Sequence, residues 1–254
     1  MVGNRVIKKV KVKGSKKKSL DSGKARSKKL RSAVLFSGGK DSGLALDYSL
    51  KYTDVKCLII IESKNPESYM FHTPNIRWAK VQAKAAGIPC IVHSTKGNKE
   101  EELKDLKSAI KNAKIKYEVQ SIVTGAIESV YQASRVQTIT NELGMECFNP
   151  LWQKDQLEIL DELIKKKFEV IIGGIAGEGF DKSWLGRTLD EKMIHELMEL
   201  NKKYGINPAF EGGEAESMVL NAPFFKKRLM VKKAKSIMTG ENSGYYDIEE
   251  LDLV

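Results

Sequence analysis

Cysteine is scarce in this sequence, and its three copies are too far apart to act together. Cys57, Cys90 and Cys147 are each flanked mainly by apolar residues. Three isolated cysteines form neither a disulfide framework nor the paired ligands of a zinc site, so we expect reduced thiols in the core. The chain also has no apolar run long enough for a membrane span or a signal-peptide core. These absences predict a cytoplasmic protein with no membrane partner.

Acidic residues are almost missing from the first part of the chain. Residues 1–31 contain 13 of the 43 Lys and Arg residues but a single acid, Asp21, whereas the remainder is close to neutral. We predict that residues 1–31 form a disordered basic arm, because a segment of this composition cannot bury a core. The arm could make a weak, salt-sensitive contact with RNA or ribosomes. Alternatively, it only keeps the chain soluble or reflects a misassigned start.

Glycine spacing excludes two common phosphate-binding loops around residues 37–42. The pattern G-x-x-x-x-G-K-[ST] fails because no glycine lies five residues before Gly39, and the G-x-G-x-x-G fingerprint is absent there. What is present is S-G-G-K-D-S, between an apolar run and a segment with helical spacing. Its polar groups are the backbone amides of Gly38 and Gly39, the Lys40 ammonium, and the hydroxyls of Ser37 and Ser42. With a helix start behind it, this loop predicts an anion cradle; the alternative is a glycine-rich turn capped by serine.

The S-G-G-K-D-S loop resembles the SGGxDS loop of the PP-loop (N-type) ATP pyrophosphatases, which cleave ATP between its α and β phosphates. The resemblance implies that Lys40 and the amides of residues 38–42 hold the phosphates of ATP. Asp41 is then a candidate ligand for Mg²⁺, which takes one or two carboxylates besides phosphates and waters. Alternatively, Asp41 is simply an acidic residue that favours a helix N-terminus.

Strands and helices alternate from residue 33 onwards. Apolar runs at 55–61, 90–93 and 121–126 predict buried strands separated by helical segments. This alternation predicts an α/β fold with a doubly wound parallel sheet, whose ligands lie at the carboxyl ends of the strands. The character of the sequence changes near residue 145. We therefore expect an ATP-binding domain over 32–145 and a smaller α+β, substrate-binding domain over 146–254.

Five further motifs make the resemblance more specific. They are M-F-H-T-P-N (70–75), G-A-I-E-S-V-Y-Q-A-S-R-V (125–136), P-L-W (150–152), S-W-L-G-R-T-L-D (183–190) and E-G-G-E-A-E-S (211–217). With the cradle they resemble the diphthine–ammonia ligase family, in a minimal archaeal-type form, over about residues 32–240. The resemblance implies amidation of the diphthine carboxylate of translation elongation factor 2 by ammonium. It further implies ATP and Mg²⁺ as cofactors, an acyl-adenylate intermediate, and diphthamide, AMP and pyrophosphate as products.

The resemblance also implies which side chains line the two sides of the site. Beside the nucleotide we expect Met70, His72, Gly125 and Ser129. Beside the substrate we expect Tyr131, Gln132, Trp184, Arg187, Gly212 and Gly213. His72 could equally be a structural loop residue, and Trp184 with Arg187 could form a hydrophobic plug. Arg135 could contact the phosphates or the substrate carboxylate, or it could form a surface ion pair. Position 137 is Gln where the resemblance leads us to expect Glu.

Three carboxylates, Glu211, Glu214 and Glu216, surround a pair of glycines. Crowded carboxylates are unfavourable unless they are solvated or matched by a cation. They could attract the trimethylammonium of diphthine and the incoming ammonium, and one of them could accept a proton from ammonium. The alternative is an exposed acidic turn.

Two other functions remain open from the sequence. The basic arm would suit a PP-loop enzyme that modifies tRNA by thiolation or lysidine formation, but three isolated cysteines offer no sulfur relay. The chain could also be a non-catalytic nucleotide-binding protein associated with ribosomes. The presence of Lys40, Asp41 and the three glutamates disfavours that reading.

Overall fold

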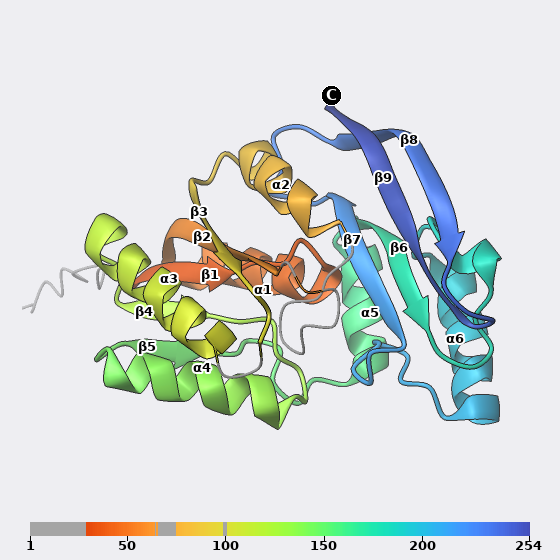
Figure 1. Ribbon diagram of the computed structural model, residues 1–254, viewed down its shortest axis with the longest axis horizontal. Helices are drawn as coiled ribbons and strands as arrows, with labels where there is room; N and C mark the ends of the chain where they lie inside the picture. The colour runs from red at the N-terminus through yellow and green to blue at the C-terminus, as the bar shows by residue number, and fades with distance from the viewer. Residues whose placement is uncertain (1–28, 64, 66–74, 99–100) are drawn as a thin grey trace, which may run out of the picture.

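Two β-sheets lie side by side in the protein, with helices around them (Figure 1). The structure, a computed structural model, describes residues 29–63, 65, 75–98 and 101–254. Met70, His72 and nearly all of the basic arm lie outside the described residues. Within the described part of the chain, no helix combines the length and the apolar character needed to cross a membrane.

The first sheet has five strands in the order β3-β2-β1-β4-β5, and all of its pairings are parallel. The strands are β1 (Arg31–Leu35), β2 (Asp54–Ser63), β3 (Cys90–Thr95), β4 (Ser121–Val123) and β5 (Glu146–Phe148). The helices between them are α1 (Lys40–Tyr52), α2 (Ala79–Ala86), α3 (Glu101–Tyr117) and α4 (Val130–Glu142), with a 3₁₀ turn, η1 (Ile76–Trp78), before α2. This sheet confirms the predicted parallel α/β fold.

Successive residues of the central strands face opposite layers of helices. Val34 and Leu58 pack in one core with α1, whereas Ala33 and Ile59 pack in another with α3 and α4. A parallel strand covered on both faces reads as a continuous apolar run. That is why β1 and β2 are recognisable in the sequence.

The three cysteines are free thiols, as predicted. Cys57 is fully buried in β2, and its burial raises the pKa of the thiol to about 12. Burial likewise raises the pKa of Cys147 to about 11. Thiols with such pKa values are poor nucleophiles at neutral pH, which fits a packing role.

The second sheet has four antiparallel strands in the order β7-β6-β9-β8. Its elements are α5 (Gln156–Lys165), β6 (Glu169–Ala176), the 3₁₀ turn η2 (Lys182–Trp184), α6 (Glu191–Tyr204), β7 (Ala215–Asn221), β8 (Leu229–Met238) and β9 (Ser243–Leu253). The acidic residues near the end of the chain lie in strand β9. Glu249 of this strand forms ion pairs with Lys233 and Lys235 of β8, so these charges belong to cross-strand pairs.

Strand β7 runs beside the cradle and joins it to the second sheet. The Val219 N–H donates to the Gly38 carbonyl at 2.9 Å, and the Lys40 N–H donates to Ser217 Oγ at 3.1 Å. The buried Gln82 side chain, from α2, donates to the carbonyls of Gly38 at 2.9 Å and Val219 at 2.7 Å. Hydrogen bonds from β7 and from α2 therefore fix the backbone of the cradle before any ligand binds.

Strand β9 stabilises the start of the η1–α2 segment. The Asn75 amide donates to the Tyr246 carbonyl at 2.6 Å and accepts from the Ile248 N–H at 3.1 Å. Trp78 Nε1 donates to the Ile248 carbonyl at 3.0 Å. Through these contacts the C-terminal hairpin places Ile76 in the wall of the cavity described next.

Candidate functional site

A cavity of about 420 Å³ opens where the carboxyl ends of β1 and β4 face the second sheet. The strand order changes direction between β1 and β4, the position at which doubly wound sheets leave a crevice for ligands. The structure brings many of the predicted residues together in the wall of this cavity. They are Ser37, Lys40, Asp41, Ser42, Gly125, Ser129, Gln132, Glu211, Gly212, Gly213 and Glu216.

The cradle itself is built from backbone around the start of α1. Gly38 has a φ of +83°, which glycine adopts readily, and Gly39 is the N-cap of the helix. Gly39 has no side chain to cap the helix, and Ser217 Oγ accepts from the Lys40 N–H in its first turn. The hydroxyls of Ser37 and Ser42 lie 3.2 Å apart beside it. Amide groups at a helix start, together with the helix dipole, favour an anion at this end of the cavity.

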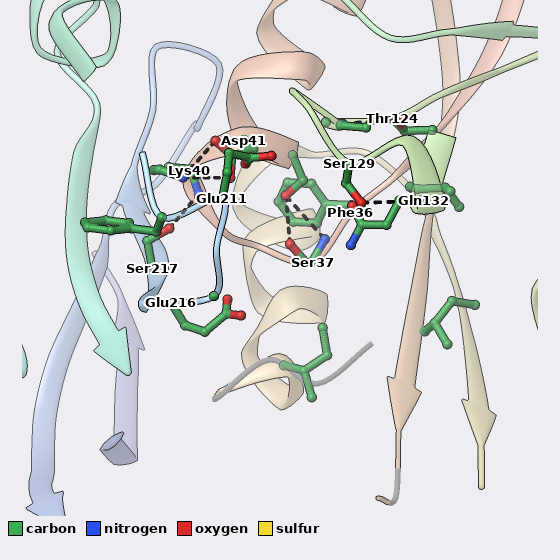
Figure 2. Close-up of a pocket in the computed structure, with 18 of the residues that line it drawn as sticks. Phe36, Ser37, Lys40, Asp41, Thr124, Ser129, Gln132, Glu211, Glu216 and Ser217 are labelled. Carbon is green, nitrogen blue, oxygen red and sulfur yellow. Dashed lines mark hydrogen bonds and ion pairs between the residues drawn. The ribbon is translucent and has the colours of Figure 1, made fainter. Parts of the chain in front are cut away.

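Lys40 supplies the positive charge of the cavity from a buried position. The side chain is only 3 % exposed, and its Nζ lies 2.9 and 2.8 Å from the two carboxylate oxygens of Asp41. The same Nζ lies 5.3 Å from the centroid of the Phe210 ring. Figure 2 shows Lys40 and Asp41 close together, with Glu211 beside them and Glu216 on the same side of the cavity.

Glu211 and Glu216 give the cavity more carboxylates than the one lysine among its described lining residues can balance. Burial raises the pKa of Glu211, and the nearby charge of Asp41 raises it further. Burial also raises the pKa of Glu216 to about 7, with Lys40 opposing and the charges of Asp41 and Glu211 adding to the increase. At neutral pH the Glu216 carboxyl can therefore exchange protons, and both groups can attract a cation.

The carboxylate excess beside the cradle fits a divalent cation bound together with phosphates. Asp41 stands at the cradle, and Mg²⁺ commonly takes one or two carboxylates, with phosphates and waters completing its coordination. Among the described residues, no group of three or more His, Cys, Asp or Glu side chains is arranged as a metal site. Phosphate oxygens and waters would thus have to supply most of the ligands.

Gly125, in the loop after β4, packs directly on the backbone of the cradle. A β-carbon at this position would lie 2.7 Å from the carbonyl carbon of Asp41 and 2.8 Å from the Ser42 nitrogen. Because both contacts are to backbone atoms, no side chain can rotate away to relieve them. The absence of a side chain at Gly125 thus allows the loops after β1 and β4 to meet.

A Gly125→Ala variant is therefore expected to push the two loops apart. We expect ATP affinity to fall by about tenfold or more and the melting temperature to drop by several degrees, since overpacking typically costs about 1–3 kcal/mol. Calorimetric titration with ATP and thermal unfolding measure both effects. Gly173→Ala in β6 is the matched control, because a β-carbon there would have no neighbour closer than 3.7 Å. Wild-type ATP affinity in Gly125→Ala would contradict the close packing of these loops.

Two predicted residues of α4 lie beside the cavity without lining it. The Arg135 guanidinium lies over the Tyr131 ring, 3.4 Å from its centroid. Ser129 and Gln132, one turn away, do line the cavity, and the Ser129 Oγ accepts from the Gln132 N–H at 3.3 Å as the N-cap of α4. Arg135 is therefore stacked on an aromatic ring and, among the residues that the structure describes, forms no ion pair.

Trp184 and Arg187 lie outside the wall of the cavity, contrary to their predicted place beside the substrate. Trp184 is 6 % exposed and packs edge-on against Phe180, with ring centroids 5.0 Å apart. The Arg187 guanidinium lies 4.6 Å from the centroid of the Trp184 ring and pairs with Glu196 of α6 at 2.6 Å. The structure thus fits the alternative of a hydrophobic plug.

Glu214 is separated from the other two glutamates by its hydrogen bonds. Its carboxylate accepts from the Asn207 N–H at 2.7 Å and from the Gly212 N–H at 2.9 Å, and it does not line the cavity. The predicted three-carboxylate cluster is therefore a pair, with Glu214 stabilising the turn that carries Glu211. Sequence reasoning missed Phe210 and Ser217, which do line the cavity. Ser217 ends the E-G-G-E-A-E-S motif, but nothing in the sequence singles out Phe210.

Comparisons with known proteins match both halves of the chain to domains of one family. Residues 30–147 match the diphthamide synthase N-terminal domain and residues 155–254 match the diphthamide synthase C-terminal domain. A diphthine–ammonia ligase from Rattus norvegicus is 32 % identical over 237 residues, covering 82 % of this chain and 85 % of the relative. The Homo sapiens diphthine–ammonia ligase is 31 % identical with the same coverage.

A solved structure described as a predicted subunit of tRNA methyltransferase, from Methanocaldococcus jannaschii, is also similar. It is 19 % identical, with a TM-score of 0.39 over 76 % of this chain and 98 % of that one. This likeness is too weak to bear on function. Because both halves match the domains of one family and full-length relatives exceed 30 % identity, the chain belongs to the diphthamide synthase family of ATP-dependent ligases.

Proposed function

We propose that this protein amidates the diphthine carboxylate of translation elongation factor 2 with ammonium, through an acyl-adenylate, producing diphthamide, AMP and pyrophosphate. The observation that carries the proposal is one cavity lined both by Ser37, Lys40, Asp41 and Ser42 of the cradle and by the acidic pair Glu211 and Glu216. An anion cradle suits ATP, whereas the acidic pair suits the cationic diphthine and ammonium. Membership of the diphthamide synthase family supports the same assignment.

In the first half-reaction, a carboxylate oxygen of diphthine attacks the α-phosphorus of ATP and pyrophosphate leaves. The transition state needs alignment and charge neutralisation more than covalent assistance. Lys40 and the amides of the cradle would hold the phosphates and stabilise the charge on the departing pyrophosphate. Asp41 would hold a Mg²⁺ ion, whose charge would neutralise that of the phosphates.

In the second half-reaction, ammonia attacks the acyl carbon and AMP leaves. Ammonium must lose a proton before it can act as a nucleophile, and the carboxyl of Glu216, with a pKa of about 7, is suited to accept it. Glu211 adds negative charge that would attract the trimethylammonium of diphthine. Both glutamates lie on the side of the cavity formed by the second sheet, across from Ser129 and Gln132 (Figure 2).

One reconstitution tests the proposal directly. Purified protein is incubated with ATP, Mg²⁺, ammonium and elongation factor 2 that carries diphthine, and AMP and the acid-to-amide mass change of the factor are followed. We expect both to appear and both to require the modified factor. AMP formation that depends on tRNA would replace the proposal with a tRNA-modifying reaction. Binding of ATP without any AMP formation would favour a nucleotide-binding protein.

A further inference from the structure

A row of stacked side chains connects the S-W-L-G-R-T-L-D motif to the lysine of the cradle. Arg187 lies over Trp184, Trp184 packs edge-on against Phe180, and Phe180 packs edge-on against Phe210 with ring centroids 6.5 Å apart. Phe210 ends the row, with the Lys40 ammonium 5.3 Å from its ring centroid. Phe180 is fully buried, so the middle of the row is closely packed and not exposed to solvent.

The backbone of Phe210 is held in an unusual conformation. Its φ of +67° lies in the left-handed region, which bulky side chains rarely adopt and which tends to occur at functional sites. The turn around it is fixed by hydrogen bonds: the Phe210 N–H donates to the Asn207 carbonyl at 2.9 Å, and the Gly213 N–H donates to the Phe210 carbonyl at 3.1 Å. Glu214, as described above, stabilises the same turn.

The ammonium of Lys40 is held by the Asp41 carboxylate on one side and lies near the Phe210 ring. Its side chain is almost fully buried, and two hydrogen bonds hold it to Asp41. A cation within about 6 Å of an aromatic ring centroid is attracted to the ring, and more strongly where water is excluded. An aliphatic side chain at position 210 would fill a similar space but would not offer this attraction.

We propose that Phe210 is a positioning residue for ATP: it holds the Lys40 ammonium at the cavity wall, with Phe180 and Trp184 supporting it from behind. The proposal rests on the proposed function, because it assumes that Lys40 contacts the phosphates. It gives the S-W-L-G-R-T-L-D motif an effect on the nucleotide site although Trp184 and Arg187 do not line the cavity.

A double-mutant cycle on ATP binding tests the proposal. Phe210→Leu is expected to weaken ATP binding by about tenfold, the effect of losing one buried cation–π contact. Phe210→Tyr keeps the ring and should bind ATP within about twofold of wild type, whereas Trp184→Leu should show a smaller loss in the same direction. In a Lys40→Met background, Phe210→Leu should cause no further loss. An equal loss in both backgrounds would show that Phe210 only packs, and would overturn the proposal.

A second measurement does not require ATP. The rate at which an amine-reactive reagent labels Lys40, followed by mass spectrometry of the folded protein, should rise several-fold in Phe210→Leu because the ammonium is released from the ring. Phe225→Leu is the control, since Phe225 stacks on Phe224 away from the cavity. Unchanged labelling in Phe210→Leu would contradict the positioning role. If the cycle and the labelling behave as expected but no amide forms on elongation factor 2, the proposed function fails and the positioning role stands.

Discussion

Replacing Lys40 with methionine is expected to lower kcat for AMP formation by about a thousandfold, the upper range for loss of one transition-state donor. Under the proposed function, Lys40 is the lysine among the described lining residues that would face the phosphates, and it is buried where its field is least screened by water. Methionine has a similar length and lacks the charge. The measurement is AMP release at saturating ATP and elongation factor 2.

Lys51→Met on the same helix is the matched control. Lys51 is an exposed lysine at the end of α1 that pairs with Asp47 at 3.2 Å, far from the cradle along the helix. We expect its AMP formation to match wild type. In Lys40→Met the pKa of Glu216 should also rise above about 7, because Lys40 is the charge that opposes the increase. Near-wild-type AMP formation in Lys40→Met would remove Lys40 from the mechanism.

The cradle and the parallel sheet could be predicted because their causes are local. Strands covered on both faces leave apolar runs, and the backbone of residues 37–42 needs glycines that the sequence displays directly. The order of strands along the chain then places the loops after β1 and β4 at one edge. No long-range information is needed for any of these steps.

Contacts between residues far apart in the chain determine what the sequence could not show. Gln82 and Ser217 bind the cradle backbone, but a buried glutamine in a helix and a serine at a strand start look unremarkable in a sequence. Glu214 resembles its neighbours Glu211 and Glu216 until the turn directs it onto the backbone amides of Asn207 and Gly212. Tertiary contacts thus divide three similar carboxylates into one structural group and two groups at the cavity.

Trp184 and Arg187 show the converse limit of prediction from sequence: they belong to a recognisable motif but do not line the cavity. A family motif indicates that a segment matters, but not whether its side chains contact the ligand. Here the motif lies behind Phe180 and Phe210, at one remove from the cavity. Trp184 and Arg187 are kept away from the cavity wall by the fold around α6, where Arg187 pairs with Glu196.

Replacing Glu216 with glutamine is expected to stabilise the ligand-free protein above pH 7 while blocking amide formation. The carboxyl has a pKa of about 7 in the folded protein against an ordinary value of 4.5, because burial disfavours its charged form. The folded state therefore binds more protons than the unfolded state between these two values, and wild-type stability falls as the pH rises through this window. Glutamine does not titrate and avoids that loss.

The expected difference is about 2 kcal/mol in the free energy of unfolding at pH 8, after allowing for partial access of the carboxyl to solvent. It should vanish below about pH 4.5, where the wild-type carboxyl is neutral in both states. Urea unfolding at a series of pH values measures it, with Glu146→Gln in β5 as a control at an exposed carboxylate. Equal pH profiles for Glu216→Gln and wild type would contradict a half-buried, proton-binding Glu216.

The same variant separates the two half-reactions. If Glu216 accepts the proton of ammonium, Glu216→Gln should still exchange pyrophosphate into ATP in the presence of diphthine-bearing elongation factor 2, because adenylation does not need this proton transfer. Amide formation should fall by about a hundredfold, within the range for loss of a general base. Loss of both activities in equal measure would instead place Glu216 on the phosphate side, as a partner of Asp41 and its cation. A stability gain combined with loss of the second step alone is the pattern expected when a cavity keeps a costly buried carboxyl because its chemistry requires one.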